Sequence, residues 1–200
     1  EKGSILLDRK NITNESVKKI RKAGLSHIPE DRNVRGLNRS MTIEENIVAA
    51  QISDAPFSNG IMLNNTKMLE YTNELIDKFD IRPRNPQTLT QGMSGGNAQK
   101  IVVAREVSIG GKVLIASQPT RGVDIGAIES IRTILMDVKE KGLGVLLVSA
   151  DLEEIFSLSD RIIVMHEGEI TGNLQVDEAD EEKVGLLMMG GKRRKEKCHE

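Results

Sequence analysis

Aromatic residues are scarce in this sequence of 200 residues, which has no tryptophan, one tyrosine and three phenylalanines. Proteins that hold single-stranded nucleic acid commonly stack its bases on aromatic side chains. The formal net charge of −2 also gives the chain no broad positive field to attract a phosphate backbone. Both absences argue against a nucleic-acid-binding protein.

Cysteine is almost absent and occurs only as Cys198. A single cysteine cannot form a disulfide within the chain, which fits a reducing compartment such as the cytosol. The three histidines, His27, His166 and His199, lack the spacing of zinc ligands. No apolar run is long enough to span a bilayer, so any work at a membrane would require docking onto other chains.

Enough apolar residues are present for a folded domain. The hydrophobic share of 38% and the charged share of 29% are those of ordinary globular proteins, and the length suits one domain with room for a subdomain. The sequence opens at Glu1 and runs directly into a strand-like segment. We therefore expect it to be a piece of a longer protein.

Strand-like and helix-like patterns alternate in the second half. Short apolar runs at residues 113–116, 145–148 and 161–165 predict buried strands, and apolar periodicity predicts helices at 127–141 and 152–158. Strands separated by single helices are typical of parallel βα units, in which helices cover both faces of a sheet. The second half therefore indicates an α/β fold.

The first half predicts a small strand-rich piece followed by helices. Apolar runs at residues 5–7 and 25–28 predict strands, with a short helix between them that Thr13 or Asn14 could cap. The Thr-x-x-Glu box that begins at Thr42 predicts the start of another helix, because its hydroxyl and carboxylate can each bind a free backbone amide of the other's residue.

A serine and two glycines stand at the expected start of a helix, in MSGGNAQK (residues 93–100). Glycines let backbone amides approach an anion closely, and a helix N-terminus supplies free N–H groups with partial positive charge. Ser94 adds a hydroxyl donor. The turn formed by Ser94, Gly95 and Gly96 can therefore bind a phosphate, and an ordinary serine-capped helix is the alternative that these residues leave open.

Motifs in a fixed order give the chain a specific resemblance over residues 3–190. MSGGNAQK resembles the signature motif of ABC transporter ATPases, in the form used by importers of simple sugars and nucleosides. VLIASQPTRGVD (residues 113–124) resembles the end of a Walker B strand followed by a D-loop. SADLEE (149–154) stands where this family has its switch region, and IPEDR (28–32) resembles the Q-loop region of the second cassette.

The resemblance divides the chain into four expected parts. Residues 1–40 form an N-terminal β piece with the Q-loop region, and residues 41–92 form a helical subdomain. Residues 93–190 form the signature helix and the α/β core, and residues 191–200 are a charged tail. The implied fold class is α/β, a partial P-loop NTPase (ABC cassette) core with a parallel sheet, a small antiparallel β piece and a helical subdomain.

Several positions depart from the family pattern. The 200 residues contain no G-x-x-x-x-G-K-[ST] motif, which by the family's order would precede Glu1. Similar ATPases end the Walker B strand in Asp-Glu, whereas Ser117 and Gln118 stand there; the switch histidine position is Ala150 and the Q-loop glutamine position is Glu30. Serine is a neutral ligand for a metal ion, and glutamine cannot accept a proton. The resemblance implies a degenerate catalytic site, with ordinary packing as the alternative for Ser117 and Ala150.

In this family two cassettes pair head to tail, so that each ATP lies between the Walker motifs of one and the signature of the other. The resemblance thus implies the second cassette of a two-cassette importer ATPase, with Asp124 in the D-loop facing the partner cassette. The residues expected to contact the partner's ATP are Ser94, Gly95, Gly96, Asn97 and Gln99. ATP and Mg²⁺ belong to the complete dimer, and neither is expected to bind tightly to this chain alone.

The implied partners are the other cassette, expected as the first half of the same polypeptide, and transmembrane permease subunits. The implied location is peripheral, at the cytoplasmic face of the cell membrane. Simple sugars and nucleosides both stay open as solutes, and QPTRG (residues 118–122) slightly favours nucleosides. A non-transport ABC protein that acts as a mechanical or translation-related switch is the alternative from another class. An inert structural adaptor is a third reading.

Overall fold

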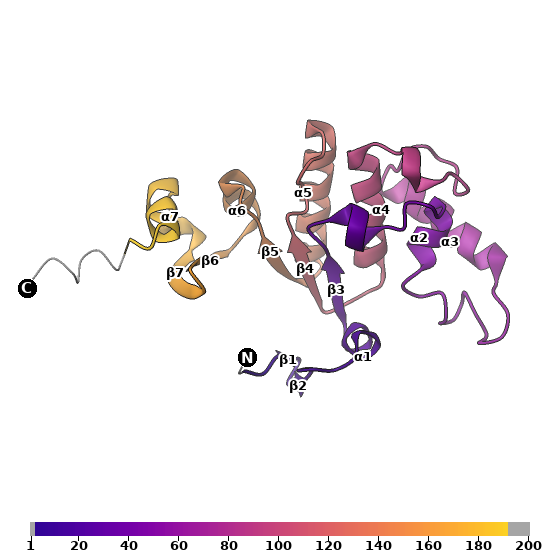
Figure 1. Cartoon of the computed structure of the whole chain (residues 1–200), viewed down its shortest axis with the longest axis horizontal. Coiled ribbons are helices and arrows are strands. Elements are labelled where there is room, and N and C mark those ends of the chain that lie inside the picture. The colour runs from indigo at the N-terminus through magenta and orange to yellow at the C-terminus, as the bar shows by residue number, and fades with distance from the viewer. Residues whose placement is uncertain (1–2, 192–200) are drawn as a thin grey trace, which may run out of the picture. The chain divides into compact units, whose positions relative to one another are not determined.

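The computed structural model describes residues 3–191. The expected charged tail, with Cys198 and His199, lies outside the described residues apart from Gly191. The chain forms two compact units, of which the first ends at Val148 and the second begins at Ser149. Each unit is described by itself (Figure 1).

A three-stranded parallel sheet forms the centre of the first unit. Its strands are β3 (Leu25–Ile28), β4 (Val113–Ser117) and β5 (Gly144–Val148), in the order β3-β4-β5. Both pairs are parallel, with Ile28 opposite Ala116 and Ser117 opposite Val148. The three strands expected from these apolar runs, and the parallel arrangement of this part, are confirmed.

Helices α4 (Gly95–Ser108) and α5 (Ile125–Glu140) connect the strands and contact both each other and the sheet. Strand order and chain order agree, so both right-handed crossovers place their helices on the same face. Side chains of that face, such as Ile28, Leu114 and Ala116, are fully buried. The expectation that helices of these units cover both faces of the sheet is therefore wrong.

Strand β5 is one of the two edge strands of this sheet, and it differs from the buried strand that its apolar run predicts. Leu146 and Val148 are 52% and 49% exposed. Alternate residues of a strand point to opposite faces, and these two point away from α4 and α5. The run Val-Leu-Leu-Val gave no sign of this difference, because its residues on the covered and uncovered faces are equally apolar.

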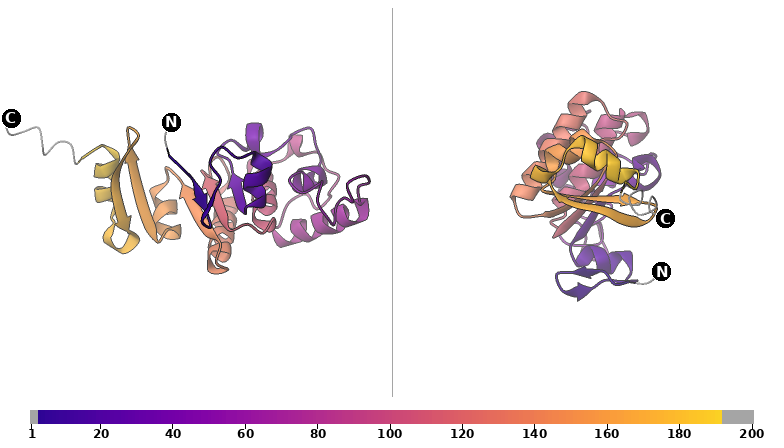
Figure 2. Two further views of the ribbon diagram at one scale, coloured as in Figure 1. Left: turned by 90° about the horizontal axis from the view of Figure 1, so that it is seen from below. Right: turned by 90° about the vertical axis from the view of Figure 1, so that its left-hand side faces the viewer.

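The N-terminal piece is a short antiparallel hairpin of β1 (Leu6–Leu7) and β2 (Lys10–Asn11), followed by α1 (Val17–Lys22). Figure 2 shows this piece extending from the rest of the first unit. Ser16 is the N-cap residue of α1, so the expected caps Thr13 and Asn14 are wrong. The hydroxyl of Thr13 instead accepts a hydrogen bond from the amide of Ile5 at 2.7 Å.

The segment after β3 contains a π-helical turn, η1 (Arg32–Gly36). It leads into α2 (Ile43–Val48), whose N-terminus has the capping box of Thr42 and Glu45 that the sequence predicts. Helix α3 (Asn65–Lys78) follows, and a 3₁₀ turn, η2 (Thr90–Gly92), precedes α4. Helix α2 contacts both α3 and α4. Within this region Phe57 and Tyr71 pack with ring centroids 5.1 Å apart.

The second unit consists of α6 (Leu152–Leu158), β6 (Arg161–His166), β7 (Glu169–Gln175), a 3₁₀ turn η3 (Val176–Glu178) and α7 (Glu181–Met188). Strands β6 and β7 form an antiparallel hairpin, and Ile162 and Val164 of β6 pack with Val184 and Leu187 of α7. The expectation that β6 continues the parallel series is wrong. Its pairing is decided by the tight turn at Glu167 and Gly168, both with positive φ.

Candidate nucleotide-binding surface

The signature turn, defined as Ser94, Gly95 and Gly96, forms the N-terminus of α4 as the sequence predicts. Ser94 is the N-cap residue, and its Oγ accepts hydrogen bonds from the backbone amide of Asn97 at 3.4 Å and from Asn97 Nδ2 at 3.1 Å. Ser94 is exposed. Since its oxygen acts as the acceptor in both bonds, its hydroxyl proton is left to donate to an anion at the helix N-terminus.

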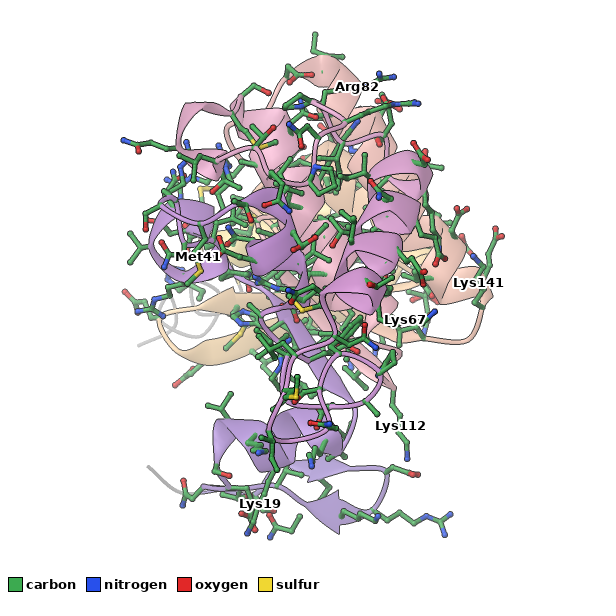
Figure 3. All side chains as sticks on the ribbon, turned by 90° about the vertical axis from the view of Figure 1, so that its right-hand side faces the viewer. Lys19, Met41, Lys67, Arg82, Lys112 and Lys141 are labelled. Carbon is green, nitrogen blue, oxygen red and sulfur yellow. The ribbon has the colours of Figure 1, made fainter. Side chains whose placement is uncertain are left out.

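Asn97 supports this turn from behind. Its Nδ2 donates to Ser94 while its Oδ1 accepts from the backbone amide of Arg82 at 2.7 Å. Both ends of the side-chain amide are therefore engaged within the chain. Figure 3 shows Arg82 at the end of the first unit opposite Lys19 of α1. Asn97 therefore fixes the direction of the Ser94 hydroxyl. The sequence predicts Asn97 as a nucleotide contact, whereas its side-chain amide is engaged within the chain.

Gln99 is placed differently from the other residues predicted to contact nucleotide. It is only 2% exposed, and its Nε2 donates to the carbonyl of Pro119 at 2.8 Å. The side chain thus joins α4 to the D-loop, defined as residues 119–124. In this structure Gln99 positions the loop and does not face the surface.

A strained residue directly precedes the D-loop. Gln118 has φ of +48°, in the left-handed region that favours glycine, and its amide still donates to the carbonyl of Val148 at 2.7 Å. At the other end of the loop Asp124 caps α5 by accepting from the amide of Ala127 at 3.0 Å. Asp124 is exposed, as a residue that faces a partner must be, but one carboxylate oxygen is already used in this cap.

The two glycines of the signature turn pack closely against the D-loop. A Cβ on Gly95 would stand 2.8 Å from both Arg32 Nη2 and the carbonyl oxygen of Gly122. A Cβ on Gly96 would stand 2.6 Å from Asp124 Oδ2 and 2.7 Å from the Cβ of Ala127. Real Cβ contacts are longer, so this approach requires residues without a side chain.

Two arginine contacts that sequence reasoning missed connect the Q-loop region to the D-loop. Arg32 donates from Nη1 to the carbonyl of Arg121 at 2.7 Å and from Nη2 to the carbonyl of Gly122 at 2.8 Å. Arg121 in turn forms an ion pair with Glu30, the residue that the sequence predicts at the Q-loop glutamine position. The run IPEDR pointed to the region, but no local pattern reveals partners about 90 residues away.

The residues at the Walker B position do not fit a magnesium ion. Ser117 ends β4 and is half-buried, and Gln118 follows it with no carboxylate at either position. Mg²⁺ in phosphate-transfer sites is usually held through carboxylates. Among residues 3–191 no group of three or more His, Cys, Asp or Glu side chains could hold a metal ion. At these two positions the described chain therefore offers a hydroxyl and an amide and no carboxylate.

The switch position lies in the second unit. Ser149 Oγ accepts from the amide of Asp151 at 3.0 Å, and Asp151 caps α6 by accepting from the amides of Glu153 and Glu154. Ala150 between them is exposed and has no group that binds a proton. This segment is thus an ordinary helix start, and the assignment of Ala150 to the switch histidine position stays a prediction.

The arrangement of strands and helices is that of an ATP-binding cassette. The dimeric ATP-binding cassette MJ0796 in a post-hydrolysis state bound to ADP and Pi matches with a TM-score of 0.73 and 21% identity, over 88% of this chain and 74% of that chain. A nucleotide-free ATP-binding cassette from an ABC transporter also gives 0.73, with 18% identity over 100% of this chain and 78% of that one. These matches confirm the fold class predicted from the sequence.

Sequence comparisons place the chain within a family. The family model described as ABC transporter matches residues 1–121, and the chain belongs to this family. It is 40% identical over 191 residues to the nucleoside import ATP-binding protein NupA of Lactococcus lactis subsp. cremoris, covering 96% of this chain and 38% of that protein. It is 40% identical to the glucose import ATP-binding protein TsgD13 of Haloferax volcanii, covering 94% of this chain and 35% of that protein.

A third relative is the ribose import ATP-binding protein RbsA of Bacillus subtilis, 38% identical over 95% of this chain and 38% of its own length. The chain thus spans less than two-fifths of the length of these curated relatives. Within residues 3–191 no helix is both long enough and apolar enough to cross a membrane. The predicted resemblance to import ATP-binding proteins is confirmed, and the position of the chain within a longer polypeptide stays a prediction.

Proposed function

We propose that this chain is the second ATP-binding cassette of an importer ATPase, which completes its partner's ATP site and contributes little hydrolysis of its own. One observation carries the proposal. The signature turn has an exposed serine at the N-terminus of a 14-residue helix, whereas Ser117 and Gln118 stand where β4 should supply carboxylates. The half of the site offered to a partner is thus well formed, and the chain's own half lacks its acidic groups.

The chain's contribution to the reaction would be electrostatic. When water attacks the γ-phosphate of ATP, catalysis depends on donors already aimed at the developing charge. The hydroxyl of Ser94 and the free amides at the start of α4 are such donors, with Gly95 and Gly96 allowing a phosphate to approach. Asn97 would act by holding Ser94, and Gln99 by holding the D-loop, since both side chains are engaged within the chain.

The chain's own site would contribute little. Gln118 has no basic group to polarise water, Ala150 has no proton acceptor, and Glu30 is engaged by Arg121. We therefore expect weak binding of ATP and Mg²⁺ by these 200 residues alone. ATP and Mg²⁺ would be held in the complete dimer, where the partner supplies the phosphate loop and the metal-binding carboxylates.

The proposed setting is a transporter at the cytoplasmic face of the membrane, with the chain bound peripherally to permease subunits through the helical region 41–92. The partner cassette is proposed as the first half of the same polypeptide. Relatives named for import of nucleosides, glucose and ribose support an importer of nucleosides or simple sugars. They also disfavour the alternative of a non-transport mechanical or translation-related switch.

The test is Ser94→Arg in the full-length protein assembled with its permease. An arginine at the helix N-terminus would block the partner's phosphate and remove the hydroxyl donor, so ATPase activity should fall about a hundredfold or more. Ser16→Arg is the control, because Ser16 is also an exposed N-cap serine but lies at α1 and makes no side-chain capping bond. If Ser94→Arg left hydrolysis and transport intact, the chain would be a structural adaptor.

A further inference from the structure

We infer that Arg32 is a positioning residue, which fastens the signature turn and the D-loop of this chain together into one surface. The inference rests on the proposed function, because that surface is the one offered to the partner's ATP. It assigns a specific role to a side chain in the Q-loop region, which precedes both elements by more than sixty residues in sequence.

The D-loop side of this contact is a two-point attachment. Nη1 and Nη2 of Arg32 donate to the successive carbonyls of Arg121 and Gly122 at 2.7 and 2.8 Å. The planar guanidinium presents its donors in a fixed fork, so two bonds to neighbouring carbonyls define both the distance and the orientation of the loop. The positive φ of +65° at Gly122 is compatible with that carbonyl direction because glycine tolerates it.

The signature side of the contact is steric. The place that a Cβ of Gly95 would fill lies 2.8 Å from Arg32 Nη2 and 2.8 Å from the Gly122 carbonyl oxygen. The guanidinium and the D-loop carbonyl therefore lie directly against the backbone of the signature turn. Any shift of Arg32 would open space beside Gly95 and release the loop at the same time.

Arg32 is itself held in place from its own side. Asp31 Oδ1 accepts from the amides of Asn33 at 2.9 Å and Val34 at 3.1 Å, which fixes the start of η1, where Arg32 is the first residue. Glu30 binds Arg121 alongside. Three consecutive residues after β3 thus fix the loop that carries Asp124, and the segment continues into the helical region. A movement of that region would be passed to both elements through Arg32.

The first readout is hydrogen exchange of the 200-residue chain with Arg32→Ala, Arg32→Lys and the control Arg39→Ala. Arg39 makes a comparable bond to a backbone carbonyl, that of Gln91 at 3.0 Å, but this bond does not involve the D-loop or the signature turn. We expect Arg32→Ala to raise exchange about tenfold or more, as for loss of local protection, in residues 94–98 and 120–124 together, with helix α3 unchanged. Arg32→Lys should protect residues 94–98 and 120–124 from exchange in part, since an ammonium group is a single point donor whereas the guanidinium offers a fixed fork of donors.

The second readout is ATP hydrolysis by the full-length protein with its permease. We expect Arg32→Ala to lower kcat about tenfold with a smaller change in KM, because misplaced donors weaken the transition state more than the bound substrate. Arg32→Lys should recover part of kcat, and Arg39→Ala should match the unaltered protein. A purely structural role would lower the amount of folded protein without this split between kcat and KM.

Two results would overturn the inference. One is unchanged exchange of residues 94–98 or 120–124 in both Arg32 variants, and the other is raised exchange with unchanged kcat. A failure of the inference about Arg32 can be distinguished from a failure of the proposed function, because the proposed function is tested by Ser94→Arg. If Ser94→Arg abolishes hydrolysis while both Arg32 variants leave it intact, the cassette role stands and Arg32 has no part in it.

Discussion

The carboxylate of Glu106 accepts a hydrogen bond from the guanidinium of Arg21 at 2.8 Å across 85 positions of sequence. The same carboxylate accepts from Arg105 Nε at 2.9 Å and from the amide of His27 at 3.3 Å. Glu106 is only 2% exposed. A single buried carboxylate near the C-terminus of α4 therefore joins α1 and β3 to the helix whose N-terminus carries the signature turn.

Glu106→Ala should destabilise the fold strongly, because it leaves the half-buried guanidinium of Arg105 and the amide of His27 without this acceptor. Removing one partner of a buried ion pair costs about 3–5 kcal/mol. Arg21→Ala should cost about 1.5–3 kcal/mol, since the Glu106 carboxylate keeps its other two donors and a hydrogen bond to a charged group contributes about that much. Urea unfolding of the isolated chain measures both, and equal losses for the two variants would contradict the assignment of Glu106 as the centre of the network.

Gly96→Ala should destabilise the chain because the new methyl group would collide with Asp124 and Ala127. Overpacking costs about 1–3 kcal/mol, which exceeds the gain of up to about 1 kcal/mol from alanine in a helix. Gly92→Ala is the matched control, with nothing within 4 Å of the added Cβ. Thermal melting distinguishes them, and a Gly96→Ala variant as stable as Gly92→Ala would show that the turn and the D-loop are not in close contact.

Restoring the catalytic groups by Ser117→Asp, Gln118→Glu and Ala150→His should raise ATPase activity of the full-length protein less than about twofold. Each missing positioned group can cost about a hundredfold, and Glu30 with its Arg121 ion pair would still occupy the Q-loop position. Steady-state hydrolysis, with the unaltered protein in parallel, measures the change. A rise of about fivefold or more would mean that these three positions alone limit the site.

The Asp8–Lys112 ion pair should make stability depend on pH at the acid end. The hydrogen bond and the charge of Lys112 hold the pKa of Asp8 below its ordinary value of 3.8. A carboxyl with a lowered folded pKa stabilises the fold above its unfolded pKa and loses this effect as pH falls through the folded pKa. Asp8→Asn should therefore lower Tm slightly at neutral pH.

That difference in Tm should vanish as pH falls through the unfolded pKa and then the lowered folded pKa of Asp8, because below both values Asp8 is protonated in both states. Lys112→Gln should show the same pH dependence, and the double variant should add nothing further. The pair is exposed, so salt at about 1 M should reduce the effect by screening. A difference in Tm that did not depend on pH would mean that Asp8→Asn acts through the backbone of the β1–β2 turn and not through the ion pair.

Features decided within a few residues could be predicted from the sequence. The capping box at Thr42, the serine cap at Ser94 and the apolar run of β4 each depend on neighbours in the chain, and each is present. The cap expected at Thr13 is wrong because its hydroxyl accepts from the distant amide of Ile5, and the cap expected at Asn14 is wrong because the helix begins two residues later, at the N-cap Ser16.

Features decided by distant partners could not be predicted. Leu146 is as apolar as a buried strand residue, and only the strand order leaves it exposed. The contact of Arg32 with Gly122 and the burial of Gln99 against Pro119 depend on how β3, β4 and α4 meet. The motifs located the candidate surface, but which side chains face outward was settled by the packing of the elements beneath it.

The packing of Phe57 against Tyr71 makes the fluorescence of Tyr71 an intrinsic probe of the helical region. With no tryptophan and a single tyrosine in the sequence, ultraviolet emission comes from one ring in the helical region. That ring contacts Phe57, and its hydroxyl accepts from Gln51 Nε2 at 3.5 Å, so its quantum yield is sensitive to how this region is arranged. Docking of the helical region against another subunit could then be followed by tyrosine fluorescence without any label. One tryptophan introduced in the sheet would accept energy from Tyr71, and the efficiency of this transfer would report the distance between the helical region and the sheet.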